Sequence, residues 1–228
     1  MSDGPCKENQ TARERASAVY VHVPFCGRKC RYCDFYSVPL ESAAARRFVE
    51  AASEELHRRV DRLALPLRSV YVGGGTPTAL GGELLGRLLR PLRGCIDAET
   101  EFTVEANPHT VTDRLARRLV DCGVNRVSVG AQSFHSRELR LLGRLHGPDD
   151  VGRTVEVLRR AGLENLNLDL IYGIPGQSPG RWRQTLRRAL ELHPEHLSCY
   201  ALSFPAGTPL EADLRTGDPL AVAEPRDR

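Results

Sequence analysis

Asn165-Leu166-Asn167-Leu168-Asp169-Leu170-Ile171 is the stretch that decides the fold, because apolar and polar side chains alternate along it. In a β-strand, alternate residues share a face, so the leucines fall on one face and Asn167 and Asp169 on the other. A leucine face packs against helices, which leaves the polar face to line the inside of a curved sheet. Buried carboxylates and amides are costly without partners. The pattern therefore predicts an interior that holds a polar ligand or water.

The strands predicted at 101–105 and 126–129 repeat this alternation, with valines on one face and hydroxyl or carboxyl groups on the other. Glu105, Gln132 and Asp169 all fall at or just after the carboxyl ends of their strands. Enzymes with barrels of parallel strands build their sites at that end. The alternative is a polar network that serves only the structure.

Short strands and helical stretches alternate along the whole chain. We expect strands at 19–23, 69–72, 101–105, 126–129, 165–171 and 196–201, and helices at 41–63, 80–92, 113–122, 151–161 and 181–192. Apolar strands separated by helices indicate a parallel sheet. Because these six units are fewer than the eight of a closed barrel, the predicted fold is α/β, a partial (β/α)6 TIM-like barrel with an open side. A doubly wound open sheet is the alternative.

Composition limits the classes of partner and the cellular location that we expect for the protein. The 228 residues carry a net charge of only +3, which gives no support for a nucleic-acid partner. Residues 1–17 are polar and no apolar run approaches spanning length, so we expect neither a signal peptide nor a transmembrane segment. A cytoplasmic location follows, and there clustered cysteines indicate metal binding. We expect Cys6 in a frayed tail, and Cys95, Cys122 and Cys199 as small hydrophobic residues.

Cys26, Cys30 and Cys33 lie within eight residues, and no fourth cysteine is close to them in sequence. Three thiolates leave one coordination position of a metal centre open. Structural zinc is an alternative, with His22 or Asp34 as the fourth ligand. Both fit poorly, because His22 lies within a strand and Asp34 adjoins Cys33.

Two further segments suit a ligand site. The glycines of Gly73-Gly74-Gly75-Thr76-Pro77 permit close approach of a ligand and positive φ angles. No Gly-Lys-Ser/Thr follows them, so a phosphate-binding loop is not indicated. Arg144 is a candidate clamp for a carboxylate-bearing ligand.

These motifs together resemble a known family. The cysteine spacing, with Tyr32 before the last cysteine, resembles the signature of radical S-adenosylmethionine (SAM) enzymes. The longer match is similar to the oxygen-independent coproporphyrinogen III oxidase family and covers roughly Val19 to Pro209. Its motifs are Tyr20–Cys26, Gly73–Thr78, Glu105–Pro108, Val129–Phe134 and Asp169–Gly176.

The resemblance implies a [4Fe–4S] cluster held by Cys26, Cys30 and Cys33, with SAM on the fourth iron. It implies SAM contacts from Tyr20, Gly74, Gly75, Thr76, Glu105, Gln132, Arg144, Asp169 and Ala201, and assigns no catalytic residue. One or two SAM molecules are both compatible with it. A reduced cluster then cleaves the S–C5′ bond of SAM to give a 5′-deoxyadenosyl radical, with an electron donor such as a flavodoxin or ferredoxin.

The sequence departs from the oxidases at Phe35, where they carry a further cysteine. This favours the haem-chaperone (HemW) branch, whose members are thought to bind haem and deliver it to haem proteins. Oxidative decarboxylation of coproporphyrinogen III is the alternative, and a non-enzymatic zinc or iron–sulfur module is the second.

The family also continues well beyond Arg228, and its haem-contacting region lies there. We therefore expect a disordered tail at 1–17, a radical SAM core at 18–210 and a truncated tail at 211–228, an arrangement that argues against haem binding by this chain.

Overall fold

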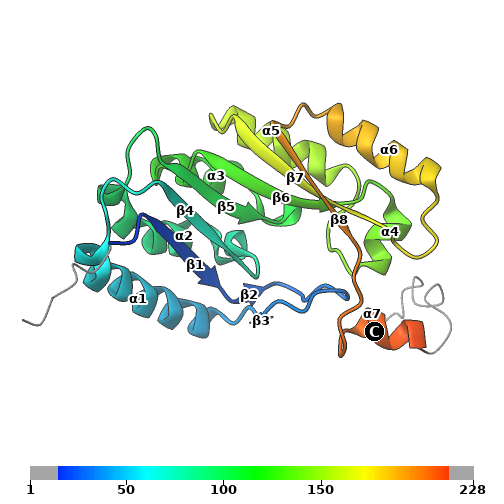
Figure 1. The fold of residues 1–228 in the computed structure, drawn as a ribbon, viewed down its shortest axis with the longest axis horizontal. Helices are drawn as coiled ribbons and strands as arrows, with labels where there is room; N and C mark the ends of the chain where they lie inside the picture. Colours follow the sequence, from blue (N-terminus) through cyan, green and yellow to red (C-terminus); the bar gives the residue numbers. More distant parts are fainter. Residues whose placement is uncertain (1–14, 216–228) are drawn as a thin grey trace, which may run out of the picture.

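The computed structural model describes residues 15–215. Its centre is a parallel sheet of six strands in the order β1-β4-β5-β6-β7-β8 (Figure 1). The strands are β1 Ala18–Val23, β4 Ser69–Gly74, β5 Glu101–Ala106, β6 Arg126–Gln132, β7 Asn165–Tyr172 and β8 His196–Ala201. Each new strand joins the sheet beside the preceding one, so the sheet is wound in one direction only. This confirms the partial barrel, since a doubly wound sheet reverses its strand order.

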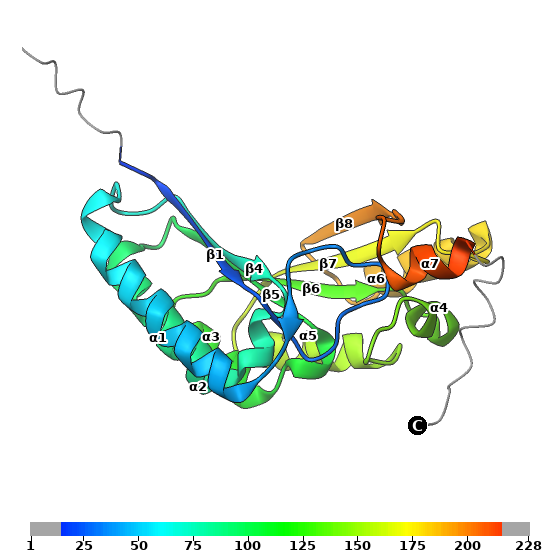
Figure 2. The same cartoon turned by 90° about the horizontal axis from the view of Figure 1, so that it is seen from below.

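The α-helices flank the sheet. They are α1 Ser42–Arg59, α2 Gly81–Leu89, α3 Asp113–Asp121, α4 Ser136–Leu141, α5 Asp150–Arg160, α6 Pro179–Leu190 and α7 Pro209–Arg215. In Figure 2, α1, α2, α3 and α5 lie along one face of the sheet, and α1 contacts α2, which contacts α3. No helix within residues 15–215 is long and apolar enough to cross a membrane.

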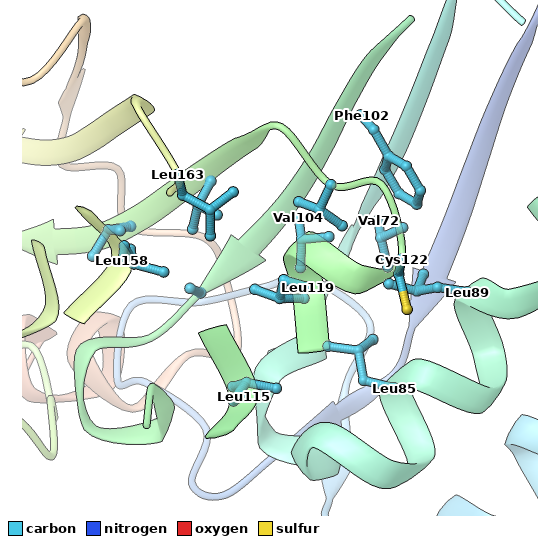
Figure 3. Packing of buried hydrophobic residues seen from close by; sticks show 14 of the residues in the cluster. Val72, Leu85, Leu89, Phe102, Val104, Leu115, Leu119, Cys122, Leu158 and Leu163 are labelled. Atoms are coloured by element: carbon cyan, nitrogen blue, oxygen red, sulfur yellow. The ribbon is translucent and has the colours of Figure 1, made fainter. Parts of the chain in front are cut away.

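The apolar strand faces pack against these helices, as the alternation predicts. Figure 3 shows strand and helix side chains meeting in one core; they include Val72, Phe102 and Val104 from the strands and Leu85, Leu89, Leu115 and Leu119 from α2 and α3. Cys95 and Cys122 are buried there, which confirms them as small hydrophobic residues. Cys199 is exposed on the edge strand β8, so the same prediction is wrong for it. Cys6 lies outside the described residues.

The opposite strand faces carry the polar layer. Glu105 pairs with Ser128 across β5 and β6, and Ser128 pairs with Asn167 across β6 and β7. Ser128 and Asn167 are buried. The parallel register therefore places polar side chains from three strands next to one another.

Several features go beyond the predicted elements. The short strands β2 Phe25–Cys26 and β3 Val38–Pro39 pair in parallel, and the helices α4 and α7 were not expected. The helix predicted at 80–92 ends at Leu89 and continues as a 3₁₀ helix, Arg90–Cys95, because Pro91 cannot continue the α-helical hydrogen bonds.

The predicted tails differ from the described structure at their inner ends. The tail predicted from 211 begins inside α7, whose Leu210 is fully buried. At the other end, the Ala16 amide donates to the Arg62 carbonyl at 3.1 Å. The remaining tail residues, 1–14 and 216–228, lie outside the described part of the chain.

A matched pair of leucines tests this packing. Leu119 is fully buried between α3 and the sheet, whereas Leu190 in α6 is 58% exposed. Leu119→Ala should lower the free energy of unfolding by about 2–5 kcal/mol, because it removes buried apolar area and leaves a cavity. Leu190→Ala should change it by less than about 0.5 kcal/mol. Urea unfolding followed by circular dichroism measures both, and equal losses would contradict the described core.

Candidate functional site

A cavity of about 440 Å³ opens at the carboxyl ends of the strands. The cysteine loop, the glycine loop after β4, and residues from β5, β6, β7 and β8 line it. Of the predicted site residues, the lining includes Cys26, Cys30, Cys33, Gly74, Gly75, Thr76, Glu105, Gln132, Arg144, Asp169 and Ala201. Tyr20 is not among them. All of the predicted site residues except Tyr20 therefore lie around one cavity.

The cysteine loop runs between β2 and β3 and is fixed at several points. Near its start, the Thr76 amide donates to the Phe25 carbonyl at 2.7 Å. At its far end the loop reaches α4 and α7 (Figure 2), where the Arg31 amide donates to the Leu142 carbonyl at 3.0 Å. The Leu210 amide donates to the Arg31 carbonyl at 2.9 Å, and Arg31 also forms an ion pair with Asp213. Segments distant in sequence thus hold the loop over the cavity.

The three thiols are half-buried and face polar neighbours. The Thr76 hydroxyl donates to Cys26 Sγ at 3.6 Å, and Arg144 Nη1 donates to Cys30 Sγ at 3.3 Å. Burial raises the pKa of the Cys33 thiol. These contacts place a hydroxyl and a cation beside sulfur atoms that carry negative charge when they bind metal.

The donor set suits a cluster better than a single metal ion. Within residues 15–215, no three His, Cys, Asp or Glu side chains are grouped closely enough to hold one ion. A tetrahedral zinc site needs such a group, whereas a [4Fe–4S] cluster takes each thiolate on a separate iron. His22 is also engaged elsewhere, because Nδ1 contacts the Tyr20 hydroxyl at 3.0 Å and Nε2 contacts the Tyr36 carbonyl at 2.9 Å. The spacing of the thiols therefore disfavours the zinc alternative.

The glycine loop is shaped by the chain's own packing. Gly74 has a φ of 109°, and a Cβ atom there would lie 2.6 Å from the His22 ring. A Cβ atom on Gly75 would lie 2.6 Å from the Phe25 carbonyl oxygen. Both positions therefore need glycine whatever the cavity holds. The sequence suggests that these glycines allow close approach of a ligand. In the structure, His22 of β1 and Phe25 of β2 are the groups that lie close to them.

Glu105 is held at the end of β5. The Tyr71 hydroxyl donates to Oε1 at 2.7 Å and the Gly74 amide donates to Oε2 at 3.1 Å. Burial raises the pKa of Glu105, and burial together with the nearby carboxylate raises that of Tyr71. Tyr20 stacks on Tyr71 with ring centroids 6.1 Å apart, so it lies beside the cavity wall.

Asp169, in the second half of β7, is held in a similar way. The Ser128 hydroxyl donates to Oδ2 and the Asn167 amide group donates to Oδ1, both at 2.8 Å. Burial raises the pKa of Asp169. Sequence reasoning identified Glu105 and Asp169 but missed the roles of Tyr71 and Asn167. The signal was present for Asn167, which shares the polar face of its strand with Asp169.

Arg144 and Gln132 carry unsatisfied polar atoms. Arg144 Nη2 donates to the Gly130 carbonyl at 2.6 Å and to Asn107 Oδ1 at 2.7 Å. Gln132 has a φ of 63°, and the β6–β7 register shifts between Gly130 and Gln132. Among the described residues, Arg144 Nε and Gln132 Oε1 are buried without a partner. Buried polar atoms are rarely left unpaired, and strained backbone concentrates at ligand sites. Both residues line the cavity, which fits a polar ligand there.

Comparison with protein-family models gives a match to the Radical SAM superfamily over residues 20–189. The chain belongs to the radical SAM superfamily. Membership implies a [4Fe–4S] cluster and SAM as cofactors. The structure fits both, since three thiols meet a cavity whose wall carries unsatisfied donor and acceptor atoms.

The chain is similar to two curated proteins named heme chaperone HemW. The protein of Lactococcus lactis is 38% identical over 83% of this chain and 50% of its own length. That of Escherichia coli is 39% identical over 84% of this chain and 52% of its own. The solved structure of coproporphyrinogen III oxidase (HemN) from E. coli, a radical SAM enzyme, superposes with a TM-score of 0.76. It is 31% identical and covers 84% of this chain and 46% of the oxidase. The chain spans about half the length of the curated relatives it matches.

His146 provides a test of the buried environment behind the cavity. It is 3% exposed, and its Nε2–H donates to the Ala131 carbonyl at 3.0 Å. Burial, with the nearby Arg144 charge, lowers the pKa of His146 to about 4. The unfolded chain therefore binds more protons as the pH falls from about 6.5 toward 4, so His146 makes the protein less stable at acid pH.

His146→Gln keeps an N–H donor but removes the titration. Between about pH 7.5 and about pH 5, the wild type should lose about 2 kcal/mol more unfolding free energy than the variant. Urea unfolding of both proteins at the two pH values measures this difference. Parallel pH dependences would show that His146 does not titrate as described.

Proposed function

We propose that this chain holds a [4Fe–4S] cluster through Cys26, Cys30 and Cys33 and binds SAM across the cavity. The observation that carries the proposal is that three thiols line the same cavity as buried polar atoms without a partner. When bound, a reduced cluster supplies the electron that cleaves the S–C5′ bond of SAM.

Different residues of the cavity contribute different groups to binding. Arg144 places its positive charge 3.3 Å from the Cys30 sulfur, where it attracts the negative charge of a metal-bound sulfur atom. Glu105 and Asp169 offer carboxylate oxygens, which accept hydrogen bonds from hydroxyl or amino groups. Gln132 Oε1 is a further acceptor, and Gly74, Gly75, Thr76 and Ala201 supply the cavity wall. Tyr20 is assigned an indirect role, through its stacking on Tyr71.

For the biological role we propose the haem-chaperone branch, with haem, a haem-accepting protein and an electron donor such as a flavodoxin or ferredoxin as partners, in the cytoplasm. The relatives named above as haem chaperones support this. So does Phe35, which is 65% exposed and lines the cavity at the position where the oxidases carry a cysteine. Oxidation of coproporphyrinogen III is the second candidate, supported by the likeness to the oxidase structure.

Two alanine variants test the ligand assignment. Cys30→Ala removes a proposed ligand at the cavity, whereas Cys95→Ala removes a buried thiol whose Sγ contacts the Pro91 carbonyl. After anaerobic reconstitution with iron and sulfide, Cys30→Ala should lose the visible absorbance of a [4Fe–4S] cluster and Cys95→Ala should retain it. Iron and zinc analysis of the same samples provides the control. A zinc-loaded, iron-free wild type, or equal cluster loss in both variants, would refute the assignment.

An activity assay separates the two candidate roles. Reconstituted protein is incubated anaerobically with coproporphyrinogen III, SAM and a reductant, and the porphyrin products are separated by chromatography. We expect no conversion of propionate to vinyl groups, because the chain has Phe35 in place of a cysteine at the cavity. An authentic oxidase in parallel shows that the assay works. Vinyl products from this chain would favour the oxidase role.

A further inference from the structure

Asn167 lies in the middle of β7 and is 1% exposed, inside the barrel beneath Asp169. Its side-chain amide makes four hydrogen bonds. Nδ2 contacts Ser128 Oγ at 2.7 Å and Asp169 Oδ1 at 2.8 Å. Oδ1 contacts His196 Nδ1 at 2.6 Å and Ser198 Oγ at 3.1 Å. An asparagine side chain has two donor hydrogens and two acceptor lone pairs, so its capacity is fully used.

The chemistry of these partners fixes the direction of every bond. An ionised carboxylate only accepts, so the Asn167 amide nitrogen must face Asp169 and the carbonyl oxygen must face β8. His196 must then carry a proton on Nδ1. Ser128 accepts from Asn167, so its own hydroxyl hydrogen is free to reach Asp169 Oδ2 at 2.8 Å. Each oxygen of Asp169 consequently receives one donor from inside the barrel.

This arrangement has a consequence at the cavity. Two donors from below hold the carboxylate of Asp169 in one orientation, and each oxygen keeps a further lone pair for a ligand. Hydrogen bonds to the charged form also offset part of the cost of burying it. Asn167 does not itself line the cavity, whereas Asp169 and Ser128 do.

We propose that Asn167 is a positioning residue, which orients Asp169 to accept a hydrogen bond from a hydroxyl or amino group of SAM. The proposal rests on the proposed function of the cavity. His196 and Ser198 take part by holding the Asn167 carbonyl from β8. His196 is the exposed first residue of β8, and its ring reaches the buried Asn167 from there.

The chain supplies a matched control. Asn165 lies two residues before Asn167 on the same strand and the same face, at the end of the barrel away from the cavity. Asn167→Ala and Asn165→Ala therefore remove the same chemical group from two positions along one strand. Asn167→Asp and Asn165→Asp form a second, nearly isosteric pair. At 167 the new carboxyl group would face the carboxylate of Asp169 in place of the donor amide.

The experiment measures the SAM dissociation constant of each reconstituted variant from the change in the electron paramagnetic resonance spectrum of the reduced cluster. Asn167→Ala should weaken SAM binding about tenfold and Asn167→Asp more, because a buried hydrogen-bonding network loses a member. Asn165→Ala and Asn165→Asp should stay within about twofold of the wild type. In an Asp169→Ala background, Asn167→Ala should add less than about twofold, since its effect runs through Asp169. Iron content and circular dichroism confirm folding in each case.

The outcomes are separable. A wild type without a cluster, or with a cluster spectrum that SAM leaves unchanged, overturns the proposed function and this inference with it. A wild type that responds to SAM, with Asn167 and Asn165 variants binding equally, overturns the inference alone. A tenfold loss that persists in the Asp169→Ala background also overturns it, because it shows a general structural effect. If Asn167→Ala does not fold, the Asp pair decides between the same results.

Discussion

The helices α1, α2, α3 and α5 cover one face of the six-stranded parallel sheet, and this commits the alternate side chains to the interior. Once Leu166, Leu168 and Leu170 are buried against the helices, Asn167 and Asp169 have no alternative to the inside of the barrel. Polar groups in that position need hydrogen-bond partners. Neighbouring strands supply them for Asn167 and Asp169, through Ser128, His196 and Ser198. The chemical character of the cavity is therefore a direct result of how the sheet packs.

The cysteine loop depends on contacts that join distant parts of the chain. Its start is hydrogen-bonded to the glycine loop after β4, and its far end is bonded to α4 and α7. Arg144 extends this system, because one guanidinium group joins Cys30, Asn107 and the Gly130 carbonyl. The thiols are thus placed by the folded barrel and not by the loop alone. Rigid supporting contacts of this kind are what a cofactor site requires.

Much of the fold and part of the site follow from the sequence in physical terms. The two-residue period predicted the inward positions of Ser128, Asn167 and Asp169, because strand geometry alone determines them. The strands β2 and β3 escaped prediction, since two residues carry no period. The helix α7 depends on burial of Leu210 against Leu141, Leu142 and Ile171, which is a tertiary effect. The positive φ of Gln132 could not be predicted from the sequence either, because glutamine rarely adopts such an angle.

The glycine loop has a consequence for the evolutionary history of such proteins. Side chains at 74 and 75 would collide with the His22 ring and the Phe25 backbone, so selection for folding alone retains these glycines. A descendant that had lost its cofactor would keep them. Selection acts differently at Gln132, whose backbone is left-handed. Glycine would adopt this conformation without strain, so the side-chain amide is the reason to keep glutamine there. Among homologous chains, glutamine at this position is therefore the more informative mark of a cavity still in use.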